Sequence, residues 1–321
     1  VSQGETTLLF TIYYNHRYLA FVTMRGITAL FAGAALLCNF ASASVIHGKP
    51  EKEPIEDLPQ FTSDLVHLLP SNNDVPILTT CNGVLNSTTG GIAYKAFEPI
   101  SVNERCVWTI RGGRAGGFSL NVLNTGSANS QDTNLIATCL QHGRGATHIS
   151  LNQTGLVNGV SACNLIIITL ASGSDVSNAT GFVLEYSVTR ASTISPTSED
   201  YIVTSENPGV IRYPNSAVYY NNNELTTFVI LPVSRSTTNV IYLKGTLESS
   251  SCYDNLSVYR FNAASTSSSK YEYVGRICGN SASDLIANQD LILITFDSDV
   301  SNTGTGFQLA LAASSSSECS A

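Results

Sequence analysis

The sequence predicts an all-β protein made of two tandem antiparallel β-sandwiches, and three observations lead to this fold class. Only 12% of the 321 residues are charged, and Ser, Thr, Asn, Gly and Val are abundant, a mixture that favours short strands and polar turns. Short apolar runs recur at regular spacing between turn-forming residues, as in sandwiches and barrels. The halves also repeat, since SGSDVSNATGF at 172–182 matches DSDVSNTGTGF at 297–307, which indicates two modules of one fold.

Each half contains several segments with the length and residue types of strands. Two of them, NLIIITL at 164–170 and DLILITF at 290–296, are continuous apolar runs. They are too short for a transmembrane helix, which needs about 20 apolar residues, so we predict buried strands and no membrane span. The other predicted strands include 106–110, 118–123 and 182–188 in the first half and 226–233, 239–245, 255–261 and 307–312 in the second.

The N-terminal region has the layout of a secretory signal peptide that begins at Met24. Arg25 precedes an apolar run over 27–40, and an Ala-x-Ala cleavage motif follows at 41–43. Cleavage is expected at the end of this motif, so the chain is predicted to be secreted. Residues 1–23 are interpreted as upstream sequence read through from a transcript, or alternatively as part of a longer N-terminus. A membrane anchor is the competing interpretation of the apolar run.

Shifts in composition set the predicted domain boundaries. The stretch KPEKEPIEDLP shows little periodicity, RASTISPTSEDYIVTSE contains a Ser/Thr/Pro hinge, and the C-terminus is rich in serine, all features of exposed connecting segments. We divide the chain into upstream sequence plus signal peptide (1–43), a flexible lead-in (44–75), a divergent first module (76–190), a linker (191–206), a second module (207–313) and a disordered tail (314–321).

Eight cysteines are present, of which Cys38 is lost with the signal peptide. Secretion places the others in an oxidising compartment, where disulfides are the default. Their order along the chain suggests three local pairs, and zinc is the weaker alternative because no C-x2-C spacing occurs. Cys319 is left over and either links two chains into a homodimer or is a free thiol. The predicted pairs are Cys81–Cys106, Cys139–Cys163 and Cys252–Cys278.

The second half resembles the CUB domain, an extracellular β-sandwich module of complement proteases, tolloid-type proteinases, spermadhesins and receptors. The resemblance rests on YPNSAVYYNNNELTTFVI, ESSSCYDNLSVY, RICG and LITFDSDVSNTGTGF within 207–313. The first half matches the family pattern at both ends, through CNGVL, CVWTI and SDVSNATGF. Its middle departs because no Cys precedes Asp132, and the second half has Thr226 where the first has Cys106. The chain therefore resembles a tandem CUB protein without a protease domain.

This resemblance implies a Ca2+ site at one end of the second module. In the family, positions matching Glu248, Asp254 and Asp299 form such a site, and Ser301 and Asn302 would add further oxygens. Ca2+ binds about six to eight oxygen ligands, and in calcium-binding CUB pairs the ordered loops accept a Lys or Arg from a partner protein. The alternative is that these residues are solvated loop acids that shape turns.

The first module is less suited to Ca2+. It offers Asp132 and Asp175, but Gly126 stands at the position of Glu248. Losing one carboxylate removes charge that a divalent ion needs, so the ion is expected in the second module. Within that module, Asp297 is the alternative to Glu248 as the third carboxylate.

Four N-x-S/T sequons predict N-glycosylation of the secreted chain. They begin at Asn86, Asn152, Asn178 and Asn255. Asn255 adjoins Asp254, so a glycan there competes with a calcium ligand at the same end of the module.

Charge and motifs argue against two function classes. A net charge of −8 without a Lys/Arg cluster disfavours nucleic-acid binding. No G-x-S-x-G, H-E-x-x-H or Gly-rich phosphate motif occurs, and His142 and His148 are interpreted as solvated loop residues. We predict a non-enzymatic protein that binds an extracellular protein or glycan. The alternatives are a structural or adhesion protein assembled through sandwich faces or Cys319, and a regulatory fragment of an enzyme.

Overall fold

The structure, a computed structural model, is an all-β chain, as predicted. It describes residues 75–315 except 113–114, 127–131, 192–194, 196, 205–209, 216, 232–236, 248–251, 263–264, 266–269, 280–286 and 290. The predicted signal segment, the lead-in up to residue 74, Glu248 and Cys319 lie outside the described residues. Within the described part, no helix has the length and apolar character needed to cross a membrane.

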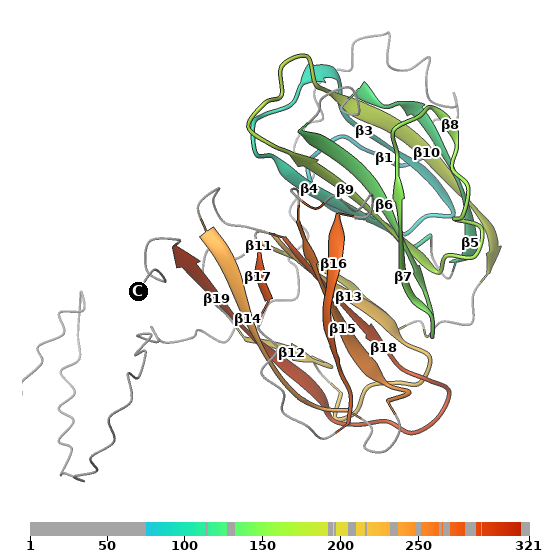
Figure 1. Ribbon diagram of the computed structural model, residues 1–321. Coiled ribbons are helices and arrows are strands. Elements are labelled where there is room, and N and C mark those ends of the chain that lie inside the picture. The colour runs from blue at the N-terminus through green and yellow to red at the C-terminus, as the bar shows by residue number, and fades with distance from the viewer. Residues whose placement is uncertain are drawn as a thin grey trace, which may run out of the picture. The chain divides into compact units, whose positions relative to one another are not determined.

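The first module is a sandwich of two five-stranded sheets (Figure 1). Its strands are β1 (Ile77–Leu78), β2 (Gly83–Leu85), β3 (Thr89–Pro99), β4 (Arg105–Ile110), β5 (Ala115–Asn124), β6 (Thr133–Gln141), β7 (Gly145–Ser150), β8 (Gly155–Leu156), β9 (Leu165–Ser172) and β10 (Thr180–Ala191). One sheet has the order β1-β3-β10-β5-β8 and the other β2-β4-β9-β6-β7. The pairs β1–β3 and β2–β4 are parallel, and the remaining pairs are antiparallel.

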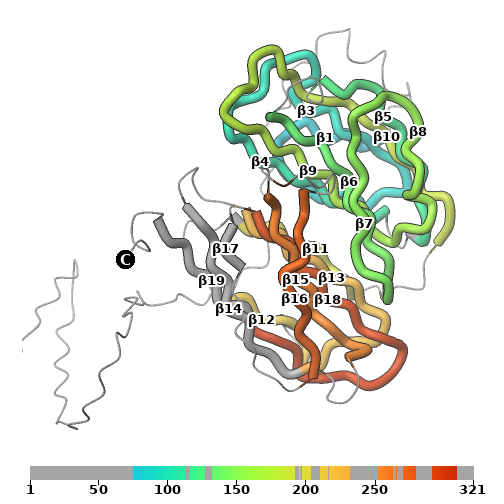
Figure 2. The backbone as a smooth tube through the Cα atoms, viewed as in Figure 1, coloured from blue at the N-terminus to red at the C-terminus, as the bar shows by residue number. Residues whose placement is uncertain are grey.

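The second module repeats this arrangement. Its strands are β11 (Asp200–Thr204), β12 (Val210–Tyr213), β13 (Leu225–Leu231), β14 (Thr237–Thr246), β15 (Asn255–Phe261), β16 (Tyr271–Ile277), β17 (Ala287–Gln289), β18 (Ile292–Asp297) and β19 (Gly306–Ser315). The sheet orders β11-β13-β18-β15-β16 and β12-β19-β14-β17 match those of the first module strand for strand, with β1 as the one strand that has no counterpart among the described residues. Figure 2 traces the backbone through each module.

The boundary between the modules differs from the prediction. Because β10 ends at Ala191 and β11 begins at Asp200, the predicted linker 191–206 wrongly includes the first strand of the second module. The described linker residues also pack on that module and do not form a free hinge. The Ser195 N–H donates to the carbonyl of Asn223 at 2.7 Å, and the Ser198 hydroxyl accepts the N–H of Leu225 at 2.9 Å. At the other end of the module, β19 extends to Ser315, beyond the predicted limit of 313.

Each module has its own aromatic core between its two sheets. In the first, the buried Trp108 indole lies 5.2 Å from the rings of Tyr94 and Phe182 and donates its N–H to the carbonyl of Thr80 at 2.8 Å. In the second, Phe228 takes the place of Trp108 and has no donor to satisfy. Burying large aromatic side chains stabilises each sandwich from within, and in the first module the paired indole N–H adds to this.

A Gly–Phe pair stands at the start of both β10 and β19, and the glycine is required there for steric reasons. A Cβ atom on Gly181 would lie 1.9 Å from the Tyr94 carbonyl oxygen, and one on Gly306 would lie 1.8 Å from that of Tyr213. Only glycine permits strands to approach so closely. The repeated sequence Gly-Phe therefore marks the same point of both sandwiches.

The three predicted disulfides, Cys81–Cys106, Cys139–Cys163 and Cys252–Cys278, are all present. The second and third lie in different places of the repeat. Cys139 is inside β6 and Cys163 precedes β9, whereas Cys252 precedes β15 and Cys278 follows β16. The irregular spacing in the middle of the first half thus reflects a different disulfide position within the same strand order.

A hydrogen bond in the second module occupies the place of the Cys81–Cys106 disulfide. The parallel register of β2 on β4 and of β11 on β13 makes Glu199 the counterpart of Cys81 and Thr226 that of Cys106. The Glu199 N–H donates to the Thr226 hydroxyl at 3.1 Å. The first strand of the second module is thus held without a covalent bond.

We expect the double variant Glu199→Cys with Thr226→Cys to form a fourth disulfide and to gain stability. Closing a loop of this length stabilises a protein by about 3 kcal/mol in the chain-entropy model. Thiol titration and thermal unfolding test this, with the single variant Thr226→Cys as control. A double variant that keeps two additional free thiols would show that the counterpart positions are not equivalent.

A third apolar core lies between the modules, which belong to one compact unit of the chain. It joins the sheet of β4, β6 and β9 to the sheet of β13, β15 and β18. Side chains alternate along β9, with Ile166 and Ile168 in the core of the first module and Leu165 and Ile167 in the shared core. Strands β9 and β18 are therefore covered on both faces, which explains their continuous apolar sequences.

Polar contacts also connect these two sheets. The Arg111 guanidinium donates from Nε and Nη2 to the two carboxylate oxygens of Asp200, both at 2.6 Å. The buried hydroxyls of Thr169 and Tyr271 are 2.7 Å apart. The His148 ring stacks on Tyr271, with centroids 5.0 Å apart, and burial lowers its pKa to about 4. The interpretation of His148 as a solvated loop residue is therefore wrong, since it lies in β7 within this interface.

Candidate functional site

The candidate site lies at one end of the second module, where three connecting segments meet. The last residue of β18, Asp297, pairs with Leu225 at the start of β13 and with Asn255 at the start of β15. The segments before β13, before β15 and after β18 therefore converge. This topology brings together residues that are far apart in the sequence.

Two of the predicted calcium ligands, Asp254 and Asp299, meet at this point. The fully buried Asp254 accepts the Tyr220 hydroxyl at 2.5 Å on Oδ2 and the Asp299 N–H at 2.7 Å on Oδ1. Asp299 Oδ1 in turn accepts the Ser301 N–H at 2.7 Å. Asn302 follows in the left-handed conformation, with φ of 60°. Asp254, Asp299 and Ser301 thus form one hydrogen-bonded loop cluster.

The first module contains the same motif with one member missing. Asp132 Oδ2 accepts the Asp175 N–H at 3.2 Å, and Asp175 Oδ1 accepts the Ser177 hydroxyl at 2.6 Å. The side-chain and backbone hydrogen bonds from Ser177 lower the pKa of Asp175. Ile100 stands where the second module has Tyr220, because the N–H groups of these two residues make the equivalent loop hydrogen bonds.

Space as well as sequence limits metal binding in the first module. A Cβ atom on Gly126 would lie 2.1 Å from the Thr180 hydroxyl and 2.3 Å from the Gly181 carbonyl. A side chain at position 126, where the sequence comparison aligns Glu248, would not fit without a backbone shift. This position of the first module therefore has no room for a third carboxylate.

The described donor set of the second module fits a divalent cation in part. Asp254 and Asp299 supply two carboxylates, and no described group unites three or more His, Cys, Asp or Glu side chains around one position. A Ca2+ site of about six to eight oxygens needs further ligands. The third predicted carboxylate, Glu248, lies outside the described residues.

Asp297, the alternative third carboxylate, is engaged elsewhere. Its Oδ2 accepts the Gly143 N–H at 2.5 Å, and its Oδ1 lies 3.1 Å from His142 Nε2. Burial raises the pKa of Asp297 to about 6; Asp254 acts in the same direction, whereas His142 and the Gly143 hydrogen bond oppose it. His142 thus contacts the second module and is not a solvated loop residue as predicted.

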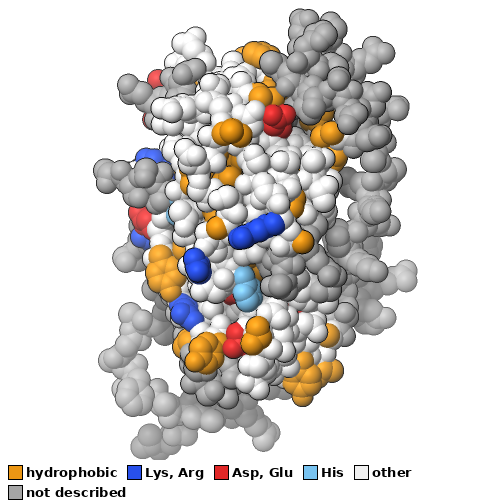
Figure 3. Space-filling model, turned by 90° about the vertical axis from the view of Figure 1, so that its right-hand side faces the viewer, with side chains coloured by type: hydrophobic (Ala, Val, Ile, Leu, Met, Phe, Trp, Pro, Cys, Tyr) orange, Lys and Arg blue, Asp and Glu red, His pale blue; other side chains and the backbone are white. Residues whose placement is uncertain are grey.

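The loop cluster is surrounded by exposed apolar side chains. Val218, Tyr219, Tyr253 and Val300 are each more than half exposed, and the Asn222 side chain ties two of their segments together by donating to the Val300 carbonyl at 2.9 Å. Scattered apolar residues are normal at a surface, but several on converging loops are typical of binding surfaces. Charged side chains are few on the face drawn in Figure 3.

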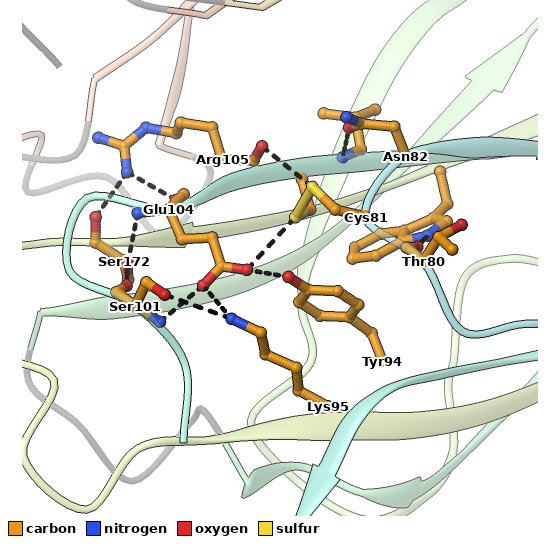
Figure 4. Close-up of a disulfide and its surroundings, with 12 residues drawn as sticks. Thr80, Cys81, Asn82, Tyr94, Lys95, Ser101, Glu104, Arg105 and Ser172 are labelled. Carbon is orange, nitrogen blue, oxygen red and sulfur yellow. Dashed lines mark hydrogen bonds and ion pairs between the residues drawn. A yellow bond between two sulfur atoms is a disulfide. The ribbon is translucent and has the colours of Figure 1, made fainter. Parts of the chain in front are cut away.

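The sequence reasoning missed a buried tyrosine–glutamate pair that recurs in both modules. Tyr94 donates to Glu104, and Tyr213 donates to Glu224 at 2.6 Å. Glu104 lies two residues before Cys106, and Glu224 lies two residues before Thr226. An alignment of the two halves of the sequence therefore contains the signal for this pair. In Figure 4 the Glu104 carboxylate points toward Tyr94, Lys95 and Ser101 near the disulfide.

The electrostatics of Glu104 follow from these contacts. Burial raises the pKa of Glu104, but hydrogen bonds from Tyr94, the Ser101 N–H and the Lys95 ammonium outweigh it, so that the pKa lies below its usual value. The Lys95 Nζ is 2.9 Å from the carboxylate. Glu104 therefore stays ionised and fixes the loop before β4, a structural role.

The predicted glycosylation sites lie at differing depths. Asn86, Asn152 and Asn178 are exposed, whereas Asn255 at the start of β15 is half-buried. The Ser257 hydroxyl donates to Asn255 Oδ1 at 3.2 Å, and the Asn255 amide donates to the Tyr253 carbonyl at 3.3 Å. Asn255 thus borders the loop cluster, as expected from its place beside Asp254.

The two sandwiches, their shared strand order and their disulfides define the class of protein: a disulfide-bonded, tandem β-sandwich protein. No family model and no curated protein matches the sequence. Among solved structures, it is similar to the CUB1-EGF-CUB2 domain of human MASP-1/3, with 14% identity and a TM-score of 0.30 over 71% of this chain and 100% of that one.

Two further solved structures show similarity at the same level. The CUB1-EGF-CUB2 domains of rat MASP-1 have 13% identity and a TM-score of 0.28, over 72% of this chain and 99% of that chain. The full extracellular region of zebrafish Gpr126/Adgrg6 has 17% identity and a TM-score of 0.27, over 76% and 38% of the two chains.

Proposed function

We propose that the chain is a secreted, non-enzymatic binding protein whose second module engages an extracellular protein through the loops around Asp254 and Asp299. The observation that carries this proposal is the hydrogen-bonded pair of the buried Asp254 and the half-buried Asp299, on loops that also carry exposed apolar side chains. Three disulfides suit an oxidising extracellular compartment.

We further propose that Ca2+ orders these loops, with Asp254 and Asp299 as carboxylate ligands, Ser301 and Asn302 as further oxygen donors and Glu248 completing the set. Two carboxylates held close together repel each other, so a cation between them would stabilise the loop conformation. When bound, the ion would supply positive charge to these carboxylates. The chain's own residues would then present a fixed surface.

The proposed partner is a protein that presents a lysine or arginine beside apolar side chains. Carboxylates fixed in a loop form strong, charge-assisted hydrogen bonds with such a cation. Tyr219 and Tyr253 offer large, rigid contact area next to the carboxylates, and tyrosine is enriched at interfaces. The combination favours a protein partner with a protruding basic residue.

Thermal unfolding with and without Ca2+ tests the proposal. At a free Ca2+ concentration 100 times the Kd, we expect a stabilisation of about 2.7 kcal/mol, which raises Tm by roughly 5–10 °C for a protein of this size. Asp299→Ala should abolish the rise, because it removes one carboxylate ligand.

Asp175→Ala is the matched control, since Asp175 occupies the equivalent loop of the first module. It should retain the full response to Ca2+. Each variant is compared with its own chelator-treated sample, because loss of the Ser301 or Ser177 hydrogen bond lowers the baseline. A wild-type Tm that is the same in Ca2+ and in chelator would exclude the calcium mechanism.

A further inference from the structure

The turn between β6 and β7 of the first module contacts the end of β18 in the second. His142 Nε2 donates to the Ser298 carbonyl at 2.7 Å, and the Gly143 N–H donates to Asp297 Oδ2 at 2.5 Å. Asp297 and Ser298 are buried. These two residues directly precede Asp299. The β6–β7 turn of the first module therefore contacts the residues from which the loop site of the second module begins.

Ser298 connects the segments of the loop cluster through its hydrogen bonds. Its hydroxyl donates to the Asn221 carbonyl at 2.7 Å and accepts the Glu224 N–H at 2.9 Å, while its own N–H donates to the Glu224 carbonyl at 3.0 Å. The next N–H, that of Asp299, donates to Asp254. Only the Ser298 carbonyl is left for a donor from outside these segments, and His142 supplies it.

The first module makes the corresponding hydrogen bonds, including the one to the serine carbonyl, with its own residues. Ser172 is the counterpart of Ser298, since its hydroxyl and N–H make the equivalent bonds to the Ser101 and Glu104 segment. Its carbonyl accepts Arg105 Nη1 at 2.5 Å. The counterpart of Arg105 is Leu225, which has no side-chain donor.

We propose that the His142–Gly143 turn of the first module is a positioning element for the loop site of the second module. The turn replaces the arginine that the second module lacks, fixes Asp297 and Ser298 from outside, and thereby holds Asp299 in place. The ligand surface then belongs to the pair of modules and not to the second module alone. This inference rests on the proposed function only for its consequence in Ca2+ binding.

Hydrogen–deuterium exchange of the segment 298–302, measured in chelator, tests the structural part without any metal. His142→Ala should accelerate exchange by roughly tenfold, the effect of losing one buried hydrogen bond. His142→Gln, which keeps a side-chain donor, should recover much of the protection. Arg144→Ala is the matched control: its side chain is exposed, its N–H bond to Gln141 survives, and exchange should stay within about twofold of wild type.

Titration of the same proteins with Ca2+ by calorimetry tests the consequence. If wild type binds Ca2+, His142→Ala should bind roughly tenfold more weakly and Arg144→Ala normally. Unchanged exchange in His142→Ala would overturn the positioning role whatever the calorimetry gives. Accelerated exchange together with no Ca2+ binding by wild type would uphold the positioning role and overturn the calcium part of the proposed function.

Discussion

Replacing Arg111 with alanine is expected to lower the free energy of unfolding by about 3–5 kcal/mol, the effect of breaking a buried ion pair. The Arg111 and Asp200 side chains are only 10% and 1% exposed, and both guanidinium–carboxylate distances are 2.6 Å. Arg111 also donates to the Leu225 carbonyl at 2.9 Å. Its loss leaves the Asp200 carboxylate buried with only the Thr227 hydroxyl as a side-chain donor among the described residues.

Arg260→Ala provides the control because its partner, Glu272, forms an ion pair of similar length, 2.8 Å, at the surface. These side chains are 42% and 31% exposed, and such surface pairs contribute little to stability. Denaturant unfolding of the two variants measures the difference. The double variant Arg111→Ala with Asp200→Asn should recover part of the loss, since no uncompensated charge remains. Equal effects of Arg111→Ala and Arg260→Ala would mean that the modules do not exclude water between them.

Most of the fold could be predicted from the sequence because it depends on local signals. Strand length, turn residues and the repeated SDVSN and Gly-Phe motifs gave two sandwiches of one fold, and cysteine order gave the three disulfides. The packing of the modules on each other was not predicted. Its signal was present in LIIITL and LILITF, because a strand covered on one face only would alternate apolar and polar residues.

The site was predicted in part for a related reason. Asp254 and Asp299 stand in motifs that repeat between the halves, so alignment alone places them at equivalent loops. His142 stands in no motif, and its contact with Ser298 spans 156 residues of sequence. Such a contact depends on how two modules pack, which neither periodicity nor spacing records. Leu225 stands where the first module has Arg105. This difference shows that the second module lacks a donor there only when the strand register is known.

Ile167→Asp is expected to destabilise the chain by at least about 4 kcal/mol, because it places an unpaired charge in an apolar core. Ile167 is fully buried, yet it lies on the outer face of its own module, opposite to Ile166 and Ile168. In an isolated module this position would face water, and aspartate would be tolerated there. The variant therefore measures the contact between modules and not the core within one.

Leu156→Asp serves as the comparison, since Leu156 is another strand residue of the same module but is 73% exposed. It should change stability by no more than about 0.5 kcal/mol. Urea unfolding gives both values, and size-exclusion chromatography distinguishes a folded chain with separated modules from a misfolded one. If Ile167→Asp matched Leu156→Asp, the face of β9 would be open to solvent, and His142 could not hold the loop of the second module. A large loss confined to Ile167→Asp would make the two sandwiches one cooperative unit, as the both-sided burial of β9 and β18 requires.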